Sequence, residues 1–382
     1  MKSSMNFEQS VFKCSRCGNC QYYCPAYNVS KRETHLARGK LQLIKKYIKE
    51  GQEGFSETQA KRMNQCLLCG NCSQNCPAGI CTEDAIEKTR EICYSQLGAQ
   101  KMLEMTAKNV ETVGNITGDS RENRLLWFEN MPKGSVRVGG KAEYLYFAGC
   151  VPTLYPSSYS IPQSFAGLLN KAGLDWTVLG ADENCCSYPL LIGGMKDAAV
   201  KTIKQNIQNV KDSGAKYIVT TCPSCYHTWK EIYPEIVPDM PDVKILHGAH
   251  LLTELSGKGV LKFKEMNSTV TYHDPCDLGR KSKVFEEPRG IIKAIPGVKL
   301  VEMKFNRESA FCCGGGGNLE MNDTELSGQV AQQRVGQALD TGADTIVTSC
   351  QQCKRTLAGG ARQKRAKIKV MELSEFVMSA IE

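Results

Sequence analysis

The stretch CLLCGNCSQNCP, residues 66–77, determines the architecture of the N-terminal part of this 382-residue chain. Its cysteines stand three, three and four residues apart, and a proline follows the last of them. A near copy, CSRCGNCQYYCP, occupies residues 14–25. The cysteines of the two runs are Cys14, Cys17, Cys20 and Cys24, then Cys66, Cys69, Cys72 and Cys76. Because three thiolates in one tight loop can surround a single metal core, the two runs predict two metal centres.

The spacing C-x2-C-x2-C-x3-C-P is similar to that of bacterial ferredoxins with two clusters. One such run would also suit zinc, but two runs that each end in Cys-Pro favour iron–sulfur clusters. In those ferredoxins the fourth cysteine of each run ligates the other cluster. The resemblance therefore implies two 4Fe-4S cubanes, one held by Cys14, Cys17, Cys20 and Cys76 and the other by Cys66, Cys69, Cys72 and Cys24.

The composition is that of a globular protein, with 41% hydrophobic and 23% charged residues. The chain carries 20 cysteines, and its start, MKSSMNFEQSVFK, lacks the apolar core of a secretory signal. Metal ligation is therefore the favoured use of the thiols over disulfides. No run of about 18 apolar residues predicts a transmembrane helix. We expect a cytoplasmic protein of an anaerobic host, whose link to the inner face of the membrane, where one exists, runs through a partner.

The formal net charge of +8 does not predict a nucleic-acid-binding protein. Its Lys and Arg residues are spread along helical stretches such as 38–49 and 361–368, and the aromatic content of 7% provides no stacking stripe. Clusters bound by thiolates carry negative charge of their own and lower the net charge of the loaded protein. These basic faces are expected to be solvated or to bind an acidic partner.

The pattern of apolar residues predicts a two-part architecture of class α+β and α/β. A helical ferredoxin-like domain is expected at residues 1–109, with helices over 34–50, 57–65 and 82–109, and a connector at 110–140. Strands alternate with helices from residue 141 onward, which predicts two α/β domains with largely parallel sheets, at 141–257 and 258–382. Expected strands are 144–150, 175–180, 216–222, 269–276, 298–303 and 344–350, and expected helices are 162–172, 195–212, 286–295 and 324–341.

The two α/β domains carry the same five-cysteine array, offset by 126 to 128 residues. Each array has a lone cysteine, a vicinal pair and a CxxC motif, in that order. The first comprises Cys150, Cys185, Cys186, Cys222 and Cys225, and the second Cys276, Cys312, Cys313, Cys350 and Cys353. The lone cysteine and the CxxC follow apolar strands, so they are expected at the carboxyl ends of strands, where open α/β sheets bind ligands.

An isolated CxxC would more often be a redox dithiol or a zinc site, but neither explains a vicinal pair and a lone cysteine repeated in the same order. The second pair opens the run CCGGGGN, residues 312–318. Glycines such as Gly314 and Gly315 allow the backbone to approach a cofactor closely and to donate N–H groups to sulfur.

The repeated C-x(34–35)-CC-x(35–36)-C-x2-C pattern behind a two-cluster segment resembles the catalytic D-type subunit of heterodisulfide reductase and related CCG-domain proteins. The strings YHDPCDLGR (272–280), EEPRGIIKAIPG (286–297) and FCCGGGGN (311–318) carry the same resemblance. It implies two non-cubane 4Fe-4S clusters, each held by the five cysteines of one array. One departure is that the first pair is followed by Ser187 in place of glycine.

The resemblance implies an enzyme that reduces a disulfide at the two non-cubane clusters, fed by the two cubanes. Iron–sulfur subunits of glycolate and lactate oxidases often lack some of these ligands, whereas both arrays are complete here. His273, beside Cys276, is the candidate proton donor, with His227 after Cys225 in the other copy; each His is more often a hydrogen-bonding or structural residue. Arg280 and Lys281 are either substrate ligands or solvated surface.

The alternative function is electron transfer from a flavin-dependent 2-hydroxy acid dehydrogenase or an electron-transfer flavoprotein. No G-x-G-x-x-G loop follows a predicted strand, so flavin is expected on another chain. The expected redox partner is a flavoprotein, a ferredoxin or a membrane cytochrome b. A multi-zinc structural protein is a third hypothesis, which iron and sulfide analysis would decide. Cys81 and Cys93 stand outside both patterns; Cys81 is an alternative ligand, or both are small buried residues.

Overall fold

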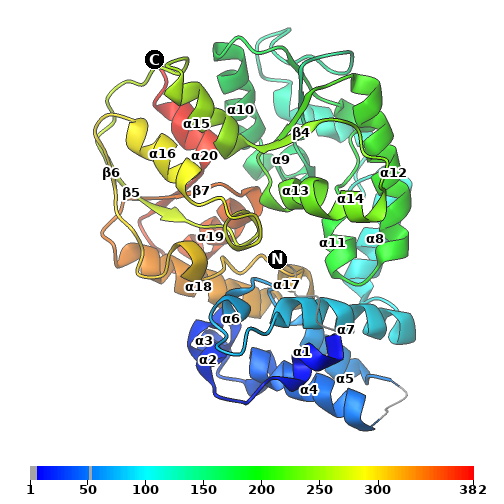
Figure 1. Cartoon of the computed structure of the whole chain (residues 1–382). Coiled ribbons are helices and arrows are strands. Elements are labelled where there is room, and N and C mark those ends of the chain that lie inside the picture. Colours follow the sequence, from blue (N-terminus) through cyan, green and yellow to red (C-terminus); the bar gives the residue numbers. More distant parts are fainter. Residues whose placement is uncertain (1–6, 51–53) are drawn as a thin grey trace.

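The computed structural model describes residues 7–50 and 54–382, and it begins with a group of helices that surrounds the two N-terminal cysteine loops (Figure 1). The predicted helices over 34–50 and 57–65 are present, the second with a capping box between Ser56 and Gln59. The helices are α1 (Phe7–Phe12), α2 (Asn19–Tyr23), α3 (Pro25–Ser30), α4 (Ala37–Glu50), α5 (Glu57–Asn64), α6 (Asn71–Gln74), α7 (Thr82–Leu97) and α8 (Lys101–Val113).

The single helix predicted over 82–109 is wrong, because the structure has two helices there. Helix α7 ends at Leu97, and the φ of 75° and ψ of −175° of the following Gly98 lie outside the helical region. Helix α8 begins after Gln100 and runs to Val113. The break frees α8 to leave the ferredoxin-like part and pack against α11 and α12 of the next domain. Both segments are amphipathic, so hydrophobic periodicity alone did not reveal the break.

Two four-stranded parallel sheets follow, and they share one topology. The first has the strand order β2-β1-β3-β4 and the second the order β6-β5-β7-β8, which is the same order one repeat later. The first sheet comprises β1 (Tyr144–Tyr146), β2 (Trp176–Thr177), β3 (Tyr217–Thr220) and β4 (Lys244–His247), and the second β5 (Ser268–His273), β6 (Val298–Leu300), β7 (Thr345–Thr348) and β8 (Lys369–Glu372). The predicted parallel α/β architecture is confirmed, and each sheet has one edge strand, β4 or β8, that was not predicted.

Helices cover both sheets and connect their strands. In the first copy these are α9 (Cys150–Leu154), α10 (Ser160–Lys171), α11 (Tyr188–Ile192), α12 (Lys196–Ser213), α13 (Pro223–His227), α14 (Tyr233–Ile236) and α15 (Gly248–Gly257). In the second copy they are α16 (Glu286–Ala294), α17 (Leu319–Asn322), α18 (Thr324–Leu339), α19 (Gln351–Gln363) and α20 (Leu373–Ser379). Single 3₁₀ segments lie at Glu33–His35, Arg121–Phe128, Pro156–Ser158, Gly180–Asp182 and Arg307–Ser309, and π turns at Thr228–Ile232 and Asp277–Lys281.

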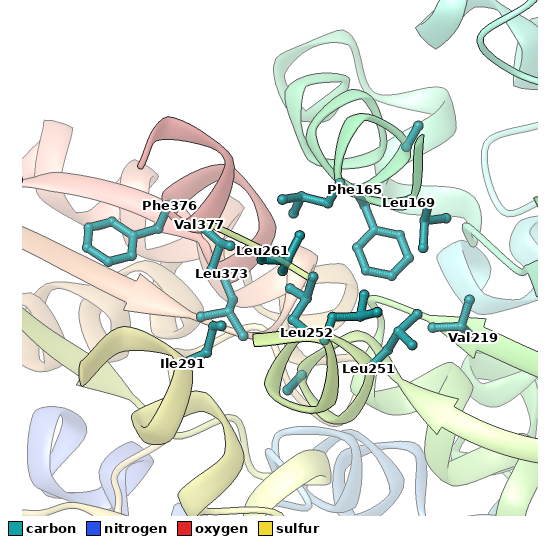
Figure 2. Close-up of a cluster of buried hydrophobic side chains, with 14 of the residues drawn as sticks. Phe165, Leu169, Val219, Leu251, Leu252, Leu261, Ile291, Leu373, Phe376 and Val377 are labelled. Carbon is teal, nitrogen blue, oxygen red and sulfur yellow. The ribbon is translucent and has the colours of Figure 1, made fainter. Parts of the chain in front are cut away.

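The two sheet domains pack through a pair of exchanged helix contacts. Helix α10 of the first copy packs on α20 of the second, and α16, the counterpart of α10, packs on α15, the counterpart of α20. Phe165, Leu252, Ile291 and Val377 contribute to one continuous buried core between these helices (Figure 2). Such a reciprocal interface relates the copies by an approximate twofold axis. The same operation brings equivalent ends of the two sheets to face each other.

None of the helices in the described part of the chain is long and apolar enough to cross a lipid bilayer.

Candidate metal centres

The second N-terminal loop forms a small buried cavity together with one cysteine from the first loop. Cys66, Cys69 and Cys72 line it, and the fourth sulfur comes from Cys24. Burial raises the pKa of Cys24 to about 12 and that of Cys69 to about 11. Thiols held this far from water stay protonated unless a cation binds them, and thiolate is the form that ligates metal.

The first N-terminal loop forms the complementary cavity, lined by Cys14, Cys17 and Cys20 and by Cys76 from the second loop. Cys72 also borders this cavity, so the two cavities lie side by side. The fourth cysteine of each run thus lies with the first three of the other run, which is the crossed grouping that the ferredoxin resemblance implies. Burial is the main cause that raises the pKa of Cys20.

The two remaining cysteines of this part lie outside both cavities. Cys93 is buried and packs with Phe55 and Ala60 as a small apolar residue. Cys81 is half-buried; burial is the main cause that raises its pKa, with a smaller contribution from Cys76, and it lines neither cavity.

The first five-cysteine array brings its sulfurs together at the carboxyl ends of adjacent strands. Cys150 follows β1, the vicinal pair lies in the loop after β2, and Cys222 precedes α13. The side chains lie within hydrogen-bond reach of one another in the order Cys150, Cys185, Cys186, Cys225, Cys222. Hydrogen bonds from Cys185 and Cys225 lower the pKa of Cys186 to about 6.

The second array repeats this arrangement with its own cysteines, linked in the order Cys276, Cys312, Cys313, Cys353, Cys350. Here the pKa of Cys313 is lowered to about 6 by hydrogen bonds from Cys312 and Cys353. Cys313 is the counterpart of Cys186, so the duplication extends to the electrostatics of single sulfur atoms.

The residue after each vicinal pair has a left-handed backbone. Gly314 has φ of 97° and Ser187 has φ of 65°. The departure from glycine in the first copy therefore leaves the turn intact, although the conformation disfavours residues with a Cβ. The backbone N–H of Ser187 donates to Cys185 Sγ at 3.3 Å, and that of Gly315 to Cys313 Sγ at 3.4 Å. Both glycines that were predicted to approach the site thus lie beside the second pair.

Five sulfurs in each array fit an iron–sulfur cluster better than a single zinc ion, because structural zinc is almost always bound by four ligands. All of these cysteines are free thiols, and most are buried. Soft thiolate sets select iron–sulfur clusters, zinc or Cu(I), and the fifth sulfur favours a cluster with several metal atoms.

A cavity of about 550 Å³ lies between the two arrays. All array cysteines except Cys312 line it, so both arrays open into the same space. Polar contacts across the domain boundary hold its walls: Asp277 accepts from Ser224 Oγ at 2.7 Å, and Gln351 Nε2 donates to Ala148 O at 3.1 Å. The two arrays are therefore placed to act on one molecule.

The surroundings of the two arrays differ in their hydrogen-bond donors. Arg124, which forms a buried ion pair with Glu183, donates from Nη2 to Cys150 Sγ at 3.2 Å in the first array. In the second, a nitrogen of the fully buried His273 lies within 4.8 Å of the sulfurs of Cys313 and Cys353. The first array has Phe147 at the place equivalent to His273.

The environment of His273 favours a neutral imidazole. Arg334 Nε donates to His273 Nδ1 at 3.0 Å, so the ring proton belongs on Nε2, which has no hydrogen-bond partner among the described residues. Burial, and then the charge of Arg334, lower the pKa of His273 well below its usual value. Nε2–H is thus a buried donor without a partner beside the second array, and the role of His273 as a proton donor stays a prediction. His227, in α13, acts electrostatically on Asp277.

Arg280 and Lys281 hydrogen-bond within the protein, and neither lines the cavity between the arrays. Arg280 is buried and donates to the carbonyl oxygens of Cys69, at 2.5 Å, and Ala310, at 2.6 Å. Lys281 Nζ donates to Tyr188 Oη at 2.7 Å and pairs with Asp277 at 3.2 Å. The interpretation of Arg280 as solvated surface is wrong, because its buried guanidinium links the second N-terminal loop to the loop before Cys312; a role as a substrate ligand stays a prediction.

The glycine run of the second array lies against the backbone of the second N-terminal loop. A Cβ on Gly317 would come within 2.3 Å of Cys66 O, and one on Gly316 within 2.8 Å of Leu67 O. Arg90, fully buried, also donates to Cys66 O at 2.8 Å and to Gly317 O at 3.0 Å. The cavity that holds Cys24 and Cys66 is therefore in direct contact with the second array.

Sequence reasoning missed several residues beside the arrays or in the lining of the cavity. Arg124 lies in the connector, where no motif marks it, and its contact with Cys150 depends on tertiary packing. Met102 and Met105 of α8, and the pair of Glu320 and Arg355, also line the cavity. The apolar face of α8 was visible in the sequence, but nothing there indicated what the helix covers.

Comparison with known proteins agrees with this geometry. A cysteine-rich domain family, CCG, matches residues 144–230 and again 270–358, and a 4Fe-4S dicluster domain matches residues 10–80. A solved structure of a hypothetical protein from Helicobacter pylori has the same fold with a TM-score of 0.55 at 12% identity, covering 90% of this chain and 66% of that one.

Curated relatives include the D-type subunit of the dihydromethanophenazine:CoB–CoM heterodisulfide reductase of Methanosarcina acetivorans, 32% identical over 96% of this chain and 93% of that protein. The "Probable iron-sulfur-binding oxidoreductase FadF" of Bacillus subtilis is 30% identical over 83% of this chain and 46% of that protein. The EtfAB:quinone oxidoreductase of Syntrophomonas wolfei is 27% identical over 97% of this chain and 58% of that protein. With 4Fe-4S and CCG domains in this order, the chain is an iron–sulfur oxidoreductase subunit that works with a redox partner, and it belongs to the family of the D-type subunits of heterodisulfide reductase.

Proposed function

We propose that this chain is the catalytic subunit of a disulfide reductase. The observation that carries the proposal is the shared cavity, into which two complete five-cysteine arrays open from opposite domains. Cleavage of a disulfide takes two electrons and two protons and yields two thiols, R–S–S–R′ + 2e⁻ + 2H⁺ → RSH + R′SH. Two centres that face one molecule suit a reaction that needs two electrons and acts on two sulfur atoms.

The ligand assignment is part of the proposal. One cubane would be held by Cys14, Cys17, Cys20 and Cys76, a second by Cys24, Cys66, Cys69 and Cys72, and a non-cubane cluster by each five-cysteine array. When bound, these clusters supply one-electron transfer and, at the arrays, the redox chemistry of disulfide cleavage. The domain limits 1–109, 110–140, 141–257 and 258–382 belong to the same proposal.

The contacts between the cysteine sites indicate the order in which electrons pass through them. The cavity with Cys72 and Cys76 adjoins the cavity with Cys24, and that cavity touches the second array through Gly317. Arg280 and Arg90 hold this junction by donating to the carbonyl oxygens of Cys69 and Cys66. We infer that electrons enter at the first N-terminal loop and reach the second array before the first.

The experiment is a viologen-coupled disulfide assay of the protein prepared without oxygen, with a cysteine variant of the cavity. Cys313→Ala should lower disulfide reduction at least a hundredfold, since Cys313 is central in its sulfur chain. Cys93 is buried away from the cysteine cavities, so Cys93→Ala should leave the rate of disulfide reduction within about twofold of the wild-type rate. Equal loss in both variants, or a wild-type protein that is inert toward every disulfide while its four sites hold iron and sulfide, would refute the proposal.

A second candidate is electron transfer between a flavoprotein and another acceptor, which the likeness to the EtfAB:quinone oxidoreductase of Syntrophomonas wolfei favours. In that role flavin would lie on a partner chain. Restored turnover of a flavin dehydrogenase by a preparation that reduces no disulfide would select this candidate over the first.

A further inference from the structure

The first N-terminal loop is the place where the cysteines of this chain come closest to solvent. All 20 cysteines lie in the described part of the chain, and Cys17 is the one among them that is exposed. Cys14, Cys20 and Cys76, which line the same cavity, are half-buried, whereas most cysteines of the two arrays are buried. Because electron transfer slows steeply with distance, a centre at this loop is the one that another protein can reach most directly.

A group of surface side chains, here called the first-loop face, borders this loop. It consists of Phe12, Lys13, Arg16, Lys45 and Lys49. Lys45, from α4, is anchored to the loop because its Nζ donates to Cys14 O at 2.9 Å. The Nζ atoms of Lys45 and Lys49 each lie 5.8 Å from the centre of the Phe12 ring, which is 40% exposed. The face thus has an aromatic ring in contact with cations beside the most exposed cysteine.

The first-loop face is positively charged. Its four cations have no acidic partner among the described residues. Two acids of the neighbouring helices are paired elsewhere, Glu33 with Arg38 at 2.7 Å and Glu50 with Lys46 at 3.9 Å. The other exposed acids of α1, α5 and α7 neither pair with these cations nor line the cavity of the first loop; they are Glu8, Glu57 and Asp84.

These properties suit a protein of opposite charge. Complementary charge steers the encounter of two proteins and fixes their orientation, which brings the same parts together each time. An exposed aromatic ring with charged side chains around it has the anatomy of a small protein–protein interface. Electron carriers bind through small and transient interfaces, so a face of this size is sufficient.

Resting on the electron path proposed above, we infer that the first-loop face docks an acidic electron-carrier protein, which reduces the centre at the first N-terminal loop. In each encounter the carrier is oxidised by one electron and the centre is reduced by one electron, while no bond forms or breaks. Two such encounters supply the two electrons that cleavage of one disulfide consumes.

Rapid mixing of the oxygen-free, oxidised holoprotein with a chemically reduced, strongly acidic ferredoxin tests the inference in the absence of a disulfide. The Debye length shortens from about 10 Å at 0.1 M salt to about 3 Å at 1 M. The second-order rate constant for reduction of the N-terminal centres should therefore fall about tenfold over this range of NaCl. With reduced methyl viologen, a small cation, the rate constant should not fall. A rate constant with ferredoxin that is independent of salt would overturn the inference.

Charge-reversal variants locate the effect on the molecule. Lys13→Glu combined with Lys49→Glu changes two exposed side chains that do not line the cavity. This face variant should react about tenfold more slowly with ferredoxin at low salt and within about twofold of wild type with methyl viologen. If it slows both donors equally, the lysines act on the centre itself, and the inference is wrong.

The matched control is Lys201→Glu combined with Lys204→Glu. Both lysines are exposed on α12, which lies in the first sheet domain, well apart from α4 (Figure 1). Each Lys→Glu exchange changes the charge by two, so either double variant has a formal net charge of +4 in place of +8. The control should keep the wild-type rate with ferredoxin. An equal loss in the two double variants would mean that net charge, and not the first-loop face, governs the encounter.

Binding provides a readout that needs no electron transfer. Calorimetric titration of the oxidised holoprotein with oxidised ferredoxin at low salt should give a Kd about tenfold weaker in the face variant and unchanged in the control. Sedimentation with phosphatidylglycerol vesicles examines a second kind of negative surface. Vesicle binding that the face variant loses, together with an unchanged Kd for ferredoxin, would assign the face to a membrane and overturn the inference.

Disulfide reduction with methyl viologen as donor separates this inference from the proposed function. Charge-dependent binding and reduction by ferredoxin, in a protein that reduces no disulfide, would support the docking face and refute the reductase. Disulfide reduction by methyl viologen, in a protein whose reaction with ferredoxin ignores salt and the face variant, would do the reverse.

Discussion

His273 distinguishes the second array from the first at the level of a single side chain. Its Nδ1 accepts from Arg334, its Nε2 has no partner among the described residues, and one ring nitrogen lies within 4.8 Å of the sulfurs of Cys313 and Cys353, where the first array has Phe147. Hydrogen bonds to sulfur stabilise the more negative, reduced state of a cluster and raise its potential. The two arrays are therefore expected to have different potentials despite identical ligand patterns.

We predict that His273→Phe lowers the midpoint potential of the centre at the second array. A hydrogen bond to a charged group is worth roughly 1.5 kcal/mol, which corresponds to about 60 mV for a one-electron couple. Potentiometric titration followed by electron paramagnetic resonance measures the shift. The centre at the first array serves as the internal control, and a shift of both centres, or of neither, would contradict the role given to His273.

Gly317 tests the contact between the second N-terminal loop and the second array. Its φ is 60°, and an added Cβ would lie 2.3 Å from Cys66 O, so Gly317→Ala must move one backbone away from the other. We expect slower reoxidation of the N-terminal centres by a disulfide, measured by stopped-flow absorbance, together with a loss of stability.

Gly342→Ala is the matched control for this change. Gly342 has φ of 73°, so alanine meets the same backbone strain, roughly 1–2 kcal/mol, but no atom lies within 4 Å of its Cβ. Electron transfer in this variant should stay at the wild-type rate. If the two variants slow electron transfer equally, the close approach at Gly317 has no part in it.

At the scale of elements, the exchanged contacts of α10 with α20 and of α15 with α16 make the two sheet domains one folding unit. Their buried side chains form a single core rather than two separate ones. Neither sheet domain can bury this surface alone, which is the usual condition of structural repeats that depend on their neighbours.

We predict that Leu252→Ala in α15 destabilises both domains together by about 2–5 kcal/mol. Leu252 is 1% exposed within the shared core, so its removal leaves a cavity that both domains line. Hydrogen exchange should show equal loss of protection in β3 of the first sheet and β7 of the second. Leu339→Ala, at a position 37% exposed, is the control and should change little. Loss of protection in the first sheet only would mean that the domains unfold independently.

Among the elements, the sequence predicted every strand except β4 and β8, which lie at one edge of each sheet. Strands β4 and β8 each begin with an exposed lysine and bury only the end of the strand, so neither shows an apolar run. The split of 82–109 at Gly98 was missed because both halves keep helical periodicity. Such features depend on what packs against a segment, and local pattern does not contain that information.

At the scale of the whole molecule, the buried Glu372 makes stability depend on pH. Burial raises the pKa of Glu372 from 4.5 to about 8, although Ser374 donates to its carboxylate. Between these values the folded state keeps a proton that the unfolded state has released. The free energy of unfolding is therefore highest below pH 4.5 for this group and falls, by a few kcal/mol in order of magnitude, as pH rises toward 8.

We predict that Glu372→Gln flattens this dependence. Chemical unfolding at pH 5.5 and at pH 8.5 measures the free energy of unfolding at each pH. The variant should exceed wild type in this free energy by most at pH 8.5. Glu254→Gln is the control, because Glu254 is exposed and its pKa is lowered by a hydrogen bond from Lys258. If Glu372→Gln and wild type lose stability in parallel from pH 5.5 to 8.5, then another group carries the effect.

The sequence by itself determined the cysteine runs, the duplicated arrays and the family, because ligand spacing and repeats are written along the chain. Tertiary structure decided that the second N-terminal loop lies against the second array and that both arrays share one cavity. It also decided that Arg280 and Arg124 form hydrogen bonds inside the protein. These properties join residues such as Cys69 and Arg280, which stand 211 positions apart and meet only when the N-terminal part packs on the second sheet domain. Such contacts follow from the packing of buried surfaces, and no local pattern specifies them.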